Sequence, residues 1–237
     1  MKDLIRELFQ KYNISINDKQ LEQLDTFYNL VIEENKKFNL TAITEKNDFA
    51  VKHLLDSCLP YMLLPKNSTI IDIGAGAGFP SLPLKIIRPD LKLTMLDSLN
   101  KRVNFLNMCV NQLGIVNAVA VHDRAEDYAI KNRECFDIAI ARAVAGLDTL
   151  CEYCLPYVKV GGRFVALKGS SYEEELNTAN FAISVLGGKL VDVQKIYVQE
   201  IDSERANIVI EKIKNTPPKY PRGKNQPRLK PLNNKSA

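Results

Sequence analysis

The chain has 237 residues, of which 46% are hydrophobic and 25% charged, enough for one sizeable core and therefore one principal domain. No run approaches 18 uncharged apolar residues, and the charged N-terminus lacks the apolar stretch of a signal peptide, so we expect a cytosolic protein without a membrane span. The net charge of +4 is uneven: from Lys212 to Ala237 there are eight basic and no acidic residues, which leaves the preceding part at −4. The tail is therefore predicted to meet a polyanion.

Residues 1–64 are predicted to form helices, because apolar residues recur there at spacings of three and four and no strand pattern is present. Asn17 and Gln20 form a capping pair for the second helix. A third amphipathic segment runs from about residue 48 to 64 and stops at Pro65. We expect this part to be an N-terminal helical extension.

From Ser68 onward, short β-branched runs alternate with helical stretches, which is typical of a parallel sheet covered on both faces. The predicted strands are 69–73, 92–97, 118–122, 136–141 and 163–168. The predicted helices are about 81–88, 100–113, 124–131, 147–158 and 172–186.

The last part of this pattern differs, because two further strand-like segments, 189–200 and 205–213, are separated by too few residues for a crossover helix. We predict an antiparallel hairpin that closes the sheet. Such a layout indicates an α/β, Rossmann-like class I methyltransferase domain over residues 65–213, and not a classical dinucleotide dehydrogenase. Residues 214–237 form a basic, proline-rich tail, for which extended or disordered backbone is expected.

The cysteines lie in apolar, periodic segments, and only Cys151 and Cys154 form a C-x-x-C pair. No second pair follows and the chain has only two histidines, so a four-ligand metal set is hard to assemble. We predict buried thiols that pack between helices, and no metal; a redox or metal role for the pair is the alternative.

A glycine-rich turn connects the first strand to its helix, with the sequence Gly74-Ala-Gly76-Ala-Gly78-Phe79-Pro80. Small residues let backbone N–H groups approach a ligand, and the helix N-terminus favours an anionic group. A tight turn can also require glycine without any ligand.

The acids around this turn favour S-adenosylmethionine over NAD. Asp97 ends the second strand, where its carboxylate could accept both hydroxyls of a ribose or cap the next helix. Asp72 adds a second acid, which a cofactor with a cationic amino group and a sulfonium tolerates better than a pyrophosphate would. The G-x-G-x-G spacing also departs from the G-x-G-x-x-G of dinucleotide binders.

Eight segments together resemble one known family over nearly the whole chain: NLTAI (39–43), HLLDS (53–57), DIGAGAGFPSLPL (72–84), LDS..KR (96–102), RAE (124–126), ARAVA (141–145), LKG (167–169) and KYPR (219–222). The chain is similar to the bacterial 16S rRNA guanine-N7 methyltransferases, the RsmG (GidB) family. The resemblance implies transfer of a methyl group from S-adenosyl-L-methionine to N7 of a guanine in small-subunit ribosomal RNA. It implies cofactor contacts at Gly74, Phe79, Ala125, Glu126 and Arg142, to which the turn and strand geometry add Gly76, Gly78 and Asp97.

Guanine N7 carries a lone pair and no proton at neutral pH, so we expect no acid–base catalytic residue. Rate enhancement should come from orientation and electrostatics. Because side chains cannot reach N7 in A-form RNA, the target should be a loop or a splayed-out base of 16S rRNA or the small ribosomal subunit. We expect a monomer. The predicted RNA contacts, for each of which a solvated surface charge is the alternative, are Arg124, Lys168, Lys101, Arg102 and Arg222.

Three other functions stay open on the residues alone. The first is an S-adenosylmethionine-dependent enzyme for a small molecule or a protein, which predicts that the tail is dispensable. The second is a non-catalytic RNA-binding module on the same fold, which predicts no cofactor binding. A dehydrogenase is the third, and the glycine spacing disfavours it.

Overall fold

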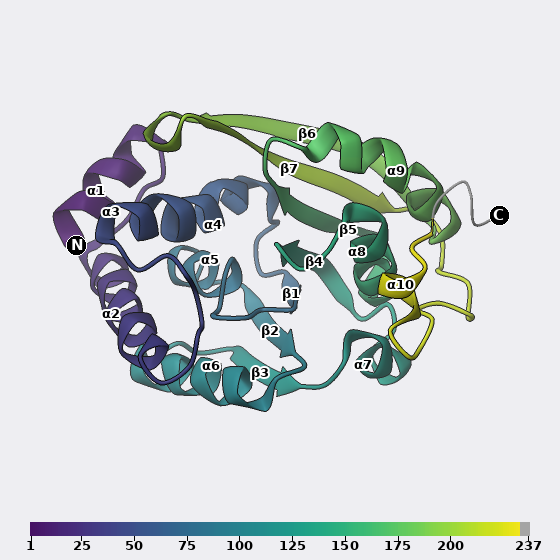
Figure 1. Ribbon diagram of the computed structural model, residues 1–237, viewed down its shortest axis with the longest axis horizontal. Coiled ribbons are helices and arrows are strands. Elements are labelled where there is room, and N and C mark those ends of the chain that lie inside the picture. Colours follow the sequence, from purple (N-terminus) through teal and green to yellow (C-terminus); the bar gives the residue numbers. More distant parts are fainter. Residues whose placement is uncertain (233–237) are drawn as a thin grey trace.

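The computed structural model describes residues 1–232, and its centre is a seven-stranded sheet with helices on both faces (Figure 1). The strand order is β3-β2-β1-β4-β5-β7-β6. Strands β1 to β5 are parallel, whereas β7 is antiparallel to both β5 and β6, so the predicted Rossmann-like sheet closed by a hairpin is confirmed. The strands are β1 Thr69–Ile73, β2 Lys92–Asp97, β3 Ala118–His122, β4 Phe136–Arg142, β5 Val158–Lys168, β6 Gly188–Val198 and β7 Ser203–Lys212.

Helices connect the parallel strands at the positions that the apolar spacing predicts. The helix predicted for 147–158 ends earlier, because Pro156 cannot donate to a helical hydrogen bond, and the turn η3 (Leu155–Tyr157) follows it. A further turn, η4 (Gln199–Ile201), joins β6 to β7. The helices are α5 Ser81–Ile87, α6 Asn100–Gln112, α7 Ala125–Lys131, α8 Leu147–Cys154 and α9 Tyr172–Val185.

The N-terminal part is helical, as predicted, beginning with α1 (Lys2–Lys11) and α2 (Asp18–Asn35). The capping pair of α2 is confirmed: the side chains of Asn17 and Gln20 each accept the other's backbone N–H, at 2.9 and 3.0 Å.

The single helix predicted for 48–64 is wrong in detail. A π-helical turn interrupts it, which shifts the phase of the following residues, and such turns are frequent at functional sites. The segment consists of α3 Lys46–Phe49, the π-helix η1 Ala50–Leu55, α4 Asp56–Cys58 and the 3-10 turn η2 Leu59–Leu63.

Alternate strand residues face two hydrophobic clusters, one on each side of the sheet. Ile70 and Ile138 belong to the first cluster, which holds the apolar faces of α1, α2, α5 and α6. Ile71 and Ala139 belong to the second, with α8 and α9. The N-terminal helices therefore share their core with the sheet, and the division into units 1–64, 65–213 and 214–237 stays a prediction.

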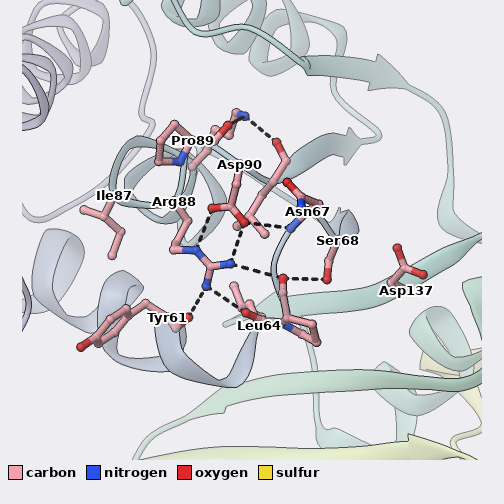
Figure 2. A network of polar contacts seen from close by, with 12 residues as sticks. Tyr61, Leu64, Asn67, Ser68, Ile87, Arg88, Pro89, Asp90 and Asp137 are labelled. Atoms are coloured by element: carbon pink, nitrogen blue, oxygen red, sulfur yellow. Dashed lines mark hydrogen bonds and ion pairs between the residues drawn. The ribbon is translucent and has the colours of Figure 1, made fainter.

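A polar network connects the N-terminal helices to the sheet at the amino-terminal ends of the parallel strands, opposite their carboxyl ends (Figure 2). The Arg88 guanidinium donates to the carbonyls of Tyr61 and Leu64, each at 2.8 Å, and to both carboxylate oxygens of Asp90. Asp90 also accepts the N–H of Asn67 at 2.9 Å, and the hydrogen bonds from Arg88 lower its pKa to about 2. The end of η2 is thereby held beside the start of β1.

Residues 214–232 of the tail have little regular secondary structure, as expected, but they pack against the protein, so the expectation of disorder is wrong. Tyr220 and Leu232 are buried in the second cluster. Arg133 donates to three tail carbonyls, those of Thr216, Pro217 and Tyr220, at 2.5 to 3.0 Å. The Arg133 guanidinium thus supplies hydrogen bonds to tail carbonyls, because the prolines of the tail keep its backbone out of regular secondary structure. The short helix α10 (Gln226–Leu229) follows near the end of the segment. Lys235 lies outside the described residues.

The cysteines are buried, as predicted, with one exception. Cys151 and Cys154 are fully buried free thiols in α8, and burial raises the pKa of both. Cys135 is exposed, so its predicted burial is wrong; it lies in the connection before β4 and not on an apolar face. Within residues 1–232, no helix combines the length and apolarity that a membrane span requires.

Candidate functional site: three adjoining cavities at the strand ends

Three adjoining cavities lie at the carboxyl ends of the parallel strands, where the strand order reverses between β1 and β4 and open α/β sheets bind ligands. The turn cavity, of about 430 Å³, lies over residues 74–79. The tail cavity, of about 300 Å³, shares Gly74 and Val144 with it. The β4–β5 cavity, of about 630 Å³, shares His53 and Arg142 with the turn cavity. Val144 lines all three cavities, which therefore meet at this residue.

The glycine turn is fixed by the end of β2. The N–H of Gly74 donates to the Leu96 carbonyl at 2.8 Å, and the N–H of Gly76 donates to the Asp97 carboxylate at 2.9 Å. Gly76 has a φ of +58° and lines the turn cavity, and a Cβ there would meet only the Gly74 carbonyl oxygen at 3.8 Å. Its surface is therefore open to a ligand.

Gly78 has a different role. A Cβ at this position would lie 2.7 Å from Leu82 and 3.1 Å from Leu106, so its missing side chain allows α5 and α6 to pack beneath the turn. Gly78 does not line any of the three cavities. Phe79 does line the turn cavity, where the His53 ring stacks on it at 4.2 Å between centroids.

Asp97 lies at the wall of the turn cavity with both oxygens engaged. One oxygen accepts from Gly76, and the other accepts the Leu99 N–H at 2.9 Å at the start of α6. Each carboxylate oxygen can accept a second hydrogen bond. Asp97 can thus hold the turn and the helix start while it accepts a ligand hydroxyl.

Ala125 and Glu126 line the tail cavity together with Gly74. The Glu126 side chain is only 3% exposed, and one of its oxygens accepts from Arg124 at 2.6 and 3.0 Å. The same oxygen accepts the N–H of Asn225, a tail residue, at 3.1 Å. The end of β3 and the tail therefore meet at this carboxylate.

Arg142, at the end of β4, is held by residues of the N-terminal helices. Its guanidinium donates to the Asp56 carboxylate at 2.7 Å, to the Lys52 carbonyl at 2.9 Å and to His53 Nδ1 at 3.1 Å. Its side chain is 13% exposed and lies over the Phe79 ring at 5.3 Å. Asp56 also accepts from Arg205 of β7 at 2.9 Å.

His53 is a neutral side chain that links Arg142 to Thr41 by hydrogen bonds. Because a guanidinium only donates, His53 Nδ1 accepts from Arg142 and Nε2 carries the proton, which it donates to Thr41 Oγ1 at 2.7 Å. Burial, and then the charge of Arg142, lower the His53 pKa to about 3. The ring therefore stays neutral at physiological pH and fixes Arg142 without exchanging protons.

Asp72 provides a test of whether a cationic cofactor fits. It is fully buried in β1 just before the glycine turn, and neither carboxylate oxygen accepts a hydrogen bond of normal geometry within residues 1–232, although Ser81 and Arg142 lie near enough to favour its ionised form. Burial raises its pKa to about 7. An unpaired buried acid is costly, and a nearby positive ligand would stabilise its ionised form. S-adenosylmethionine, with its ammonium and sulfonium, fits this environment, whereas a pyrophosphate does not.

The β4–β5 cavity is lined by four basic and two acidic side chains. The Lys168 ammonium, 6% exposed, donates to Glu175 at 2.6 Å and to the Ala145 carbonyl at 2.8 Å. Glu175 also accepts the Leu147 N–H at 2.8 Å. Lys168 and Glu175 thus fix the loop that follows β4, and the basic surplus suits an anionic ligand.

The predicted RNA contacts occupy different environments. The Arg124 side chain is 50% exposed, Lys101 lies over the Phe38 ring at 4.9 Å, and Arg102 pairs with Asp97 at 3.5 Å. These three can still reach RNA. Lys168 is buried, and Arg222 pairs with a buried carboxylate, so the geometry favours structural roles for both.

Several site residues were not expected from the sequence. The segments NLTAI and HLLDS, which contribute to the family resemblance, contain Thr41, His53 and Asp56, but the sequence analysis predicted no role for these three residues. Arg205 lies in a strand without any motif, and Arg228 counted only as tail charge. The recurrence of polar residues in HLLDS on an otherwise apolar helix was the available signal.

The chain is similar to known proteins over nearly its whole length. A family model described as rRNA small subunit methyltransferase G matches residues 20–205. A protein named ribosomal RNA small subunit methyltransferase G from Lactobacillus johnsonii is 49% identical over 228 residues, which are 94% of this chain and 95% of that protein. One of the same name from Staphylococcus saprophyticus is 50% identical over 224 residues, covering 93% of this chain and 94% of the relative.

Among solved structures, a precorrin-6y C5,15-methyltransferase from Geobacter metallireducens superposes with a TM-score of 0.52 at 14% identity, covering 77% of this chain and 98% of that one. This likeness concerns the fold alone.

Proposed function

The chain belongs to the rRNA small subunit methyltransferase G family, and we propose that its acceptor, N7 of a guanine in 16S rRNA, enters the β4–β5 cavity. The protein is an S-adenosylmethionine-dependent methyltransferase of small-subunit ribosomal RNA. Arg142 and His53 line both the turn cavity and the β4–β5 cavity, and this shared wall carries the proposal. A cofactor over the glycine turn and a base in the β4–β5 cavity would meet there. We further propose that the enzyme acts as a monomer in the cytoplasm.

When bound, S-adenosylmethionine supplies a methyl group on a positively charged sulfur. Guanine N7 has no proton to lose, so no side chain needs to act as a base, and neutral His53 is consistent with this. Arg142 holds the wall between the two cavities, and Lys168 with Glu175 fixes the loop beside the base. Asp56 and Glu175 are the two carboxylates of the cavity wall, and because each is already paired with a basic side chain, the rate enhancement is expected to come mainly from orientation of the two reactants.

The acceptor is tested by methyl transfer with tritiated S-adenosylmethionine. The substrates are naked 16S rRNA and small subunits, both from a strain that lacks the gene, and the products are digested to nucleosides. We expect label in 7-methylguanosine alone. Label in another nucleoside would contradict the N7 assignment, and label only in a small molecule or a protein would favour the alternative acceptors.

Affinity for S-adenosylmethionine is expected to increase as the pH rises through about 7. Asp72 is protonated below this pH and ionised above it, and its ionised form attracts the cationic cofactor. Calorimetric titrations at about pH 6 and about pH 8 measure the effect. S-adenosylhomocysteine, which lacks the sulfonium charge, should show a smaller dependence.

Asp72→Asn is the matched variant, and it should bind the cofactor weakly and without this pH dependence. The unfolded chain ionises Asp72 at lower pH than the native chain does, so burial of Asp72 lowers the free energy of unfolding progressively as the pH rises from 3.8 to about 7, and the full cost is present above that pH. The variant should therefore not lower the free energy of unfolding at about pH 8. A wild-type affinity that is flat with pH would remove Asp72 from the cofactor site.

The exposed lysines of the tail are expected to carry part of the salt-dependent RNA affinity. Deleting the tail would also remove buried residues, so Lys219→Gln with Lys224→Gln is the cleaner variant. On single strands, the slope of log affinity against log salt concentration is about −0.7 for each phosphate that is neutralised. The double variant should therefore make this slope shallower by about 1 unit. Lys66→Gln with Lys189→Gln removes the same charge from other exposed positions and serves as the control. Equal slopes for both pairs would make the tail a passive surface.

A further inference from the structure

We propose that residues 223–229 of the tail complete the S-adenosylmethionine site, and that Arg228 contacts the adenosine half of the cofactor. This inference rests on the proposed placement of the cofactor over the glycine turn. Figure 1 shows α10 beside α8, with α7 close by. Asn225 and Arg228 line the tail cavity, and Arg228 also lines the turn cavity with Gly74 and Asp97.

The tail is anchored at this position by buried groups. Arg222 donates to both oxygens of Glu152, which is 0% exposed, at 2.6 to 3.2 Å. Its guanidinium also donates to the Lys230 carbonyl at 2.8 Å, which closes a loop between residues 222 and 230. Within that loop, the Pro227 carbonyl accepts from Thr149 Oγ1 at 3.2 Å. The wall is therefore fixed in place before any ligand arrives.

A direct link joins this wall to a predicted cofactor contact. The N–H of Asn225 donates to Glu126 at 3.1 Å, and its side chain accepts from the Tyr153 hydroxyl at 3.3 Å. Asn225 has a φ of +59°, a left-handed conformation that asparagine tolerates, and it turns the chain into α10. Glu126, which the family resemblance assigns to the cofactor, thus also holds the tail.

Arg228 differs from the other arginines of the site, because its guanidinium has no hydrogen-bond or ion-pair partner among residues 1–232. Arg124, Arg142 and Arg222 are all paired with carboxylates. A guanidinium is a planar cation that stacks on aromatic faces and donates to ring nitrogens and hydroxyls. An adenosine offers all of these acceptors. The exposed Arg228 side chain therefore has the chemistry and the position to close over it.

The sequence analysis predicted every cofactor contact between Gly74 and Arg142. The geometry adds a further contact, Arg228, which lies more than 80 residues after Arg142 in the chain. The test is calorimetric titration of the full-length protein, without RNA, with S-adenosylmethionine and separately with S-adenosylhomocysteine. Arg228→Ala should weaken both ligands by about tenfold, since a contact made by a charged donor is worth about that factor. Lys230→Ala removes the same charge from the same exposed tail and should leave both affinities unchanged.

A second readout follows from linkage, because a ligand that the tail helps to bind must in turn stabilise the docked tail. S-adenosylhomocysteine should slow tryptic cleavage after Lys224, a site that both proteins retain, in the wild type and slow it much less in Arg228→Ala. Equal affinities for wild type and Arg228→Ala would overturn the inference, as would tighter binding of S-adenosylmethionine alone in that variant. Absence of binding by the wild type would instead overturn the proposed function.

Discussion

Replacing Gly76 by valine is expected to abolish S-adenosylmethionine binding in a protein that still folds. The Cβ position of Gly76 points into the turn cavity, with only the Gly74 carbonyl within 4 Å. A branched side chain there occupies the space in which backbone must approach the cofactor. Calorimetry should show a loss of at least about 100-fold in affinity.

The φ of +58° at Gly76 means that valine also strains the backbone, at a cost of about 1–3 kcal/mol. Gly114→Val is the matched control, since Gly114 has a φ of +60°, no atom within 4 Å of its Cβ position, and a place outside the three cavities. Both variants should lose similar stability, and only Gly76→Val should lose the cofactor. Undiminished affinity in Gly76→Val would remove the turn from the site.

Arg142→Ala is expected to reduce kcat/KM for rRNA methylation by about 100-fold or more, because the residue forms the wall between the turn cavity and the β4–β5 cavity, where we propose that cofactor and acceptor meet. If Arg142 formed only a surface ion pair, its loss would cost about 1 kcal/mol of stability and leave turnover unchanged. The structure excludes the surface pair, since Arg142 is largely buried and makes three polar contacts. We therefore also expect the free energy of unfolding to fall by about 1–3 kcal/mol.

Arg205→Ala separates the effect on catalysis from the effect on stability. Arg205 is the other ion-pair partner of Asp56, but of the two cavities that Arg142 lines it lines only the β4–β5 cavity. Arg142→Ala should weaken cofactor binding and lower kcat, whereas Arg205→Ala should act on the KM for RNA alone. Arg142→Lys keeps the charge but cannot make three directed contacts, so it should recover stability more than turnover. Near-normal turnover in Arg142→Ala, with the cofactor still bound, would show that the wall is only structural.

The secondary structure was largely predictable because it depends on local patterns. Period-2 and period-3.6 spacing located the parallel strands and the helices between them, and the short link after residue 200 required a hairpin. The π-helical turn η1 was not predictable, since nothing in the apolar spacing of residues 48–64 distinguishes it from an α-helix. That turn contributes Lys52 and His53 to the site.

By itself, the sequence determined the fold class, the glycine turn and the family, because each depends on patterns of residues that are close together in the chain. Only the tertiary structure decided what the charged side chains do, because their roles depend on which partners the fold brings near. Arg142 meets Asp56, which lies 86 positions earlier, and Arg222 meets the buried Glu152. Lys168 and Arg222, predicted to contact RNA, are paired with carboxylates of the protein. Arg228, which the sequence presents only as one of the tail charges, lines the turn cavity and has no side-chain partner among residues 1–232.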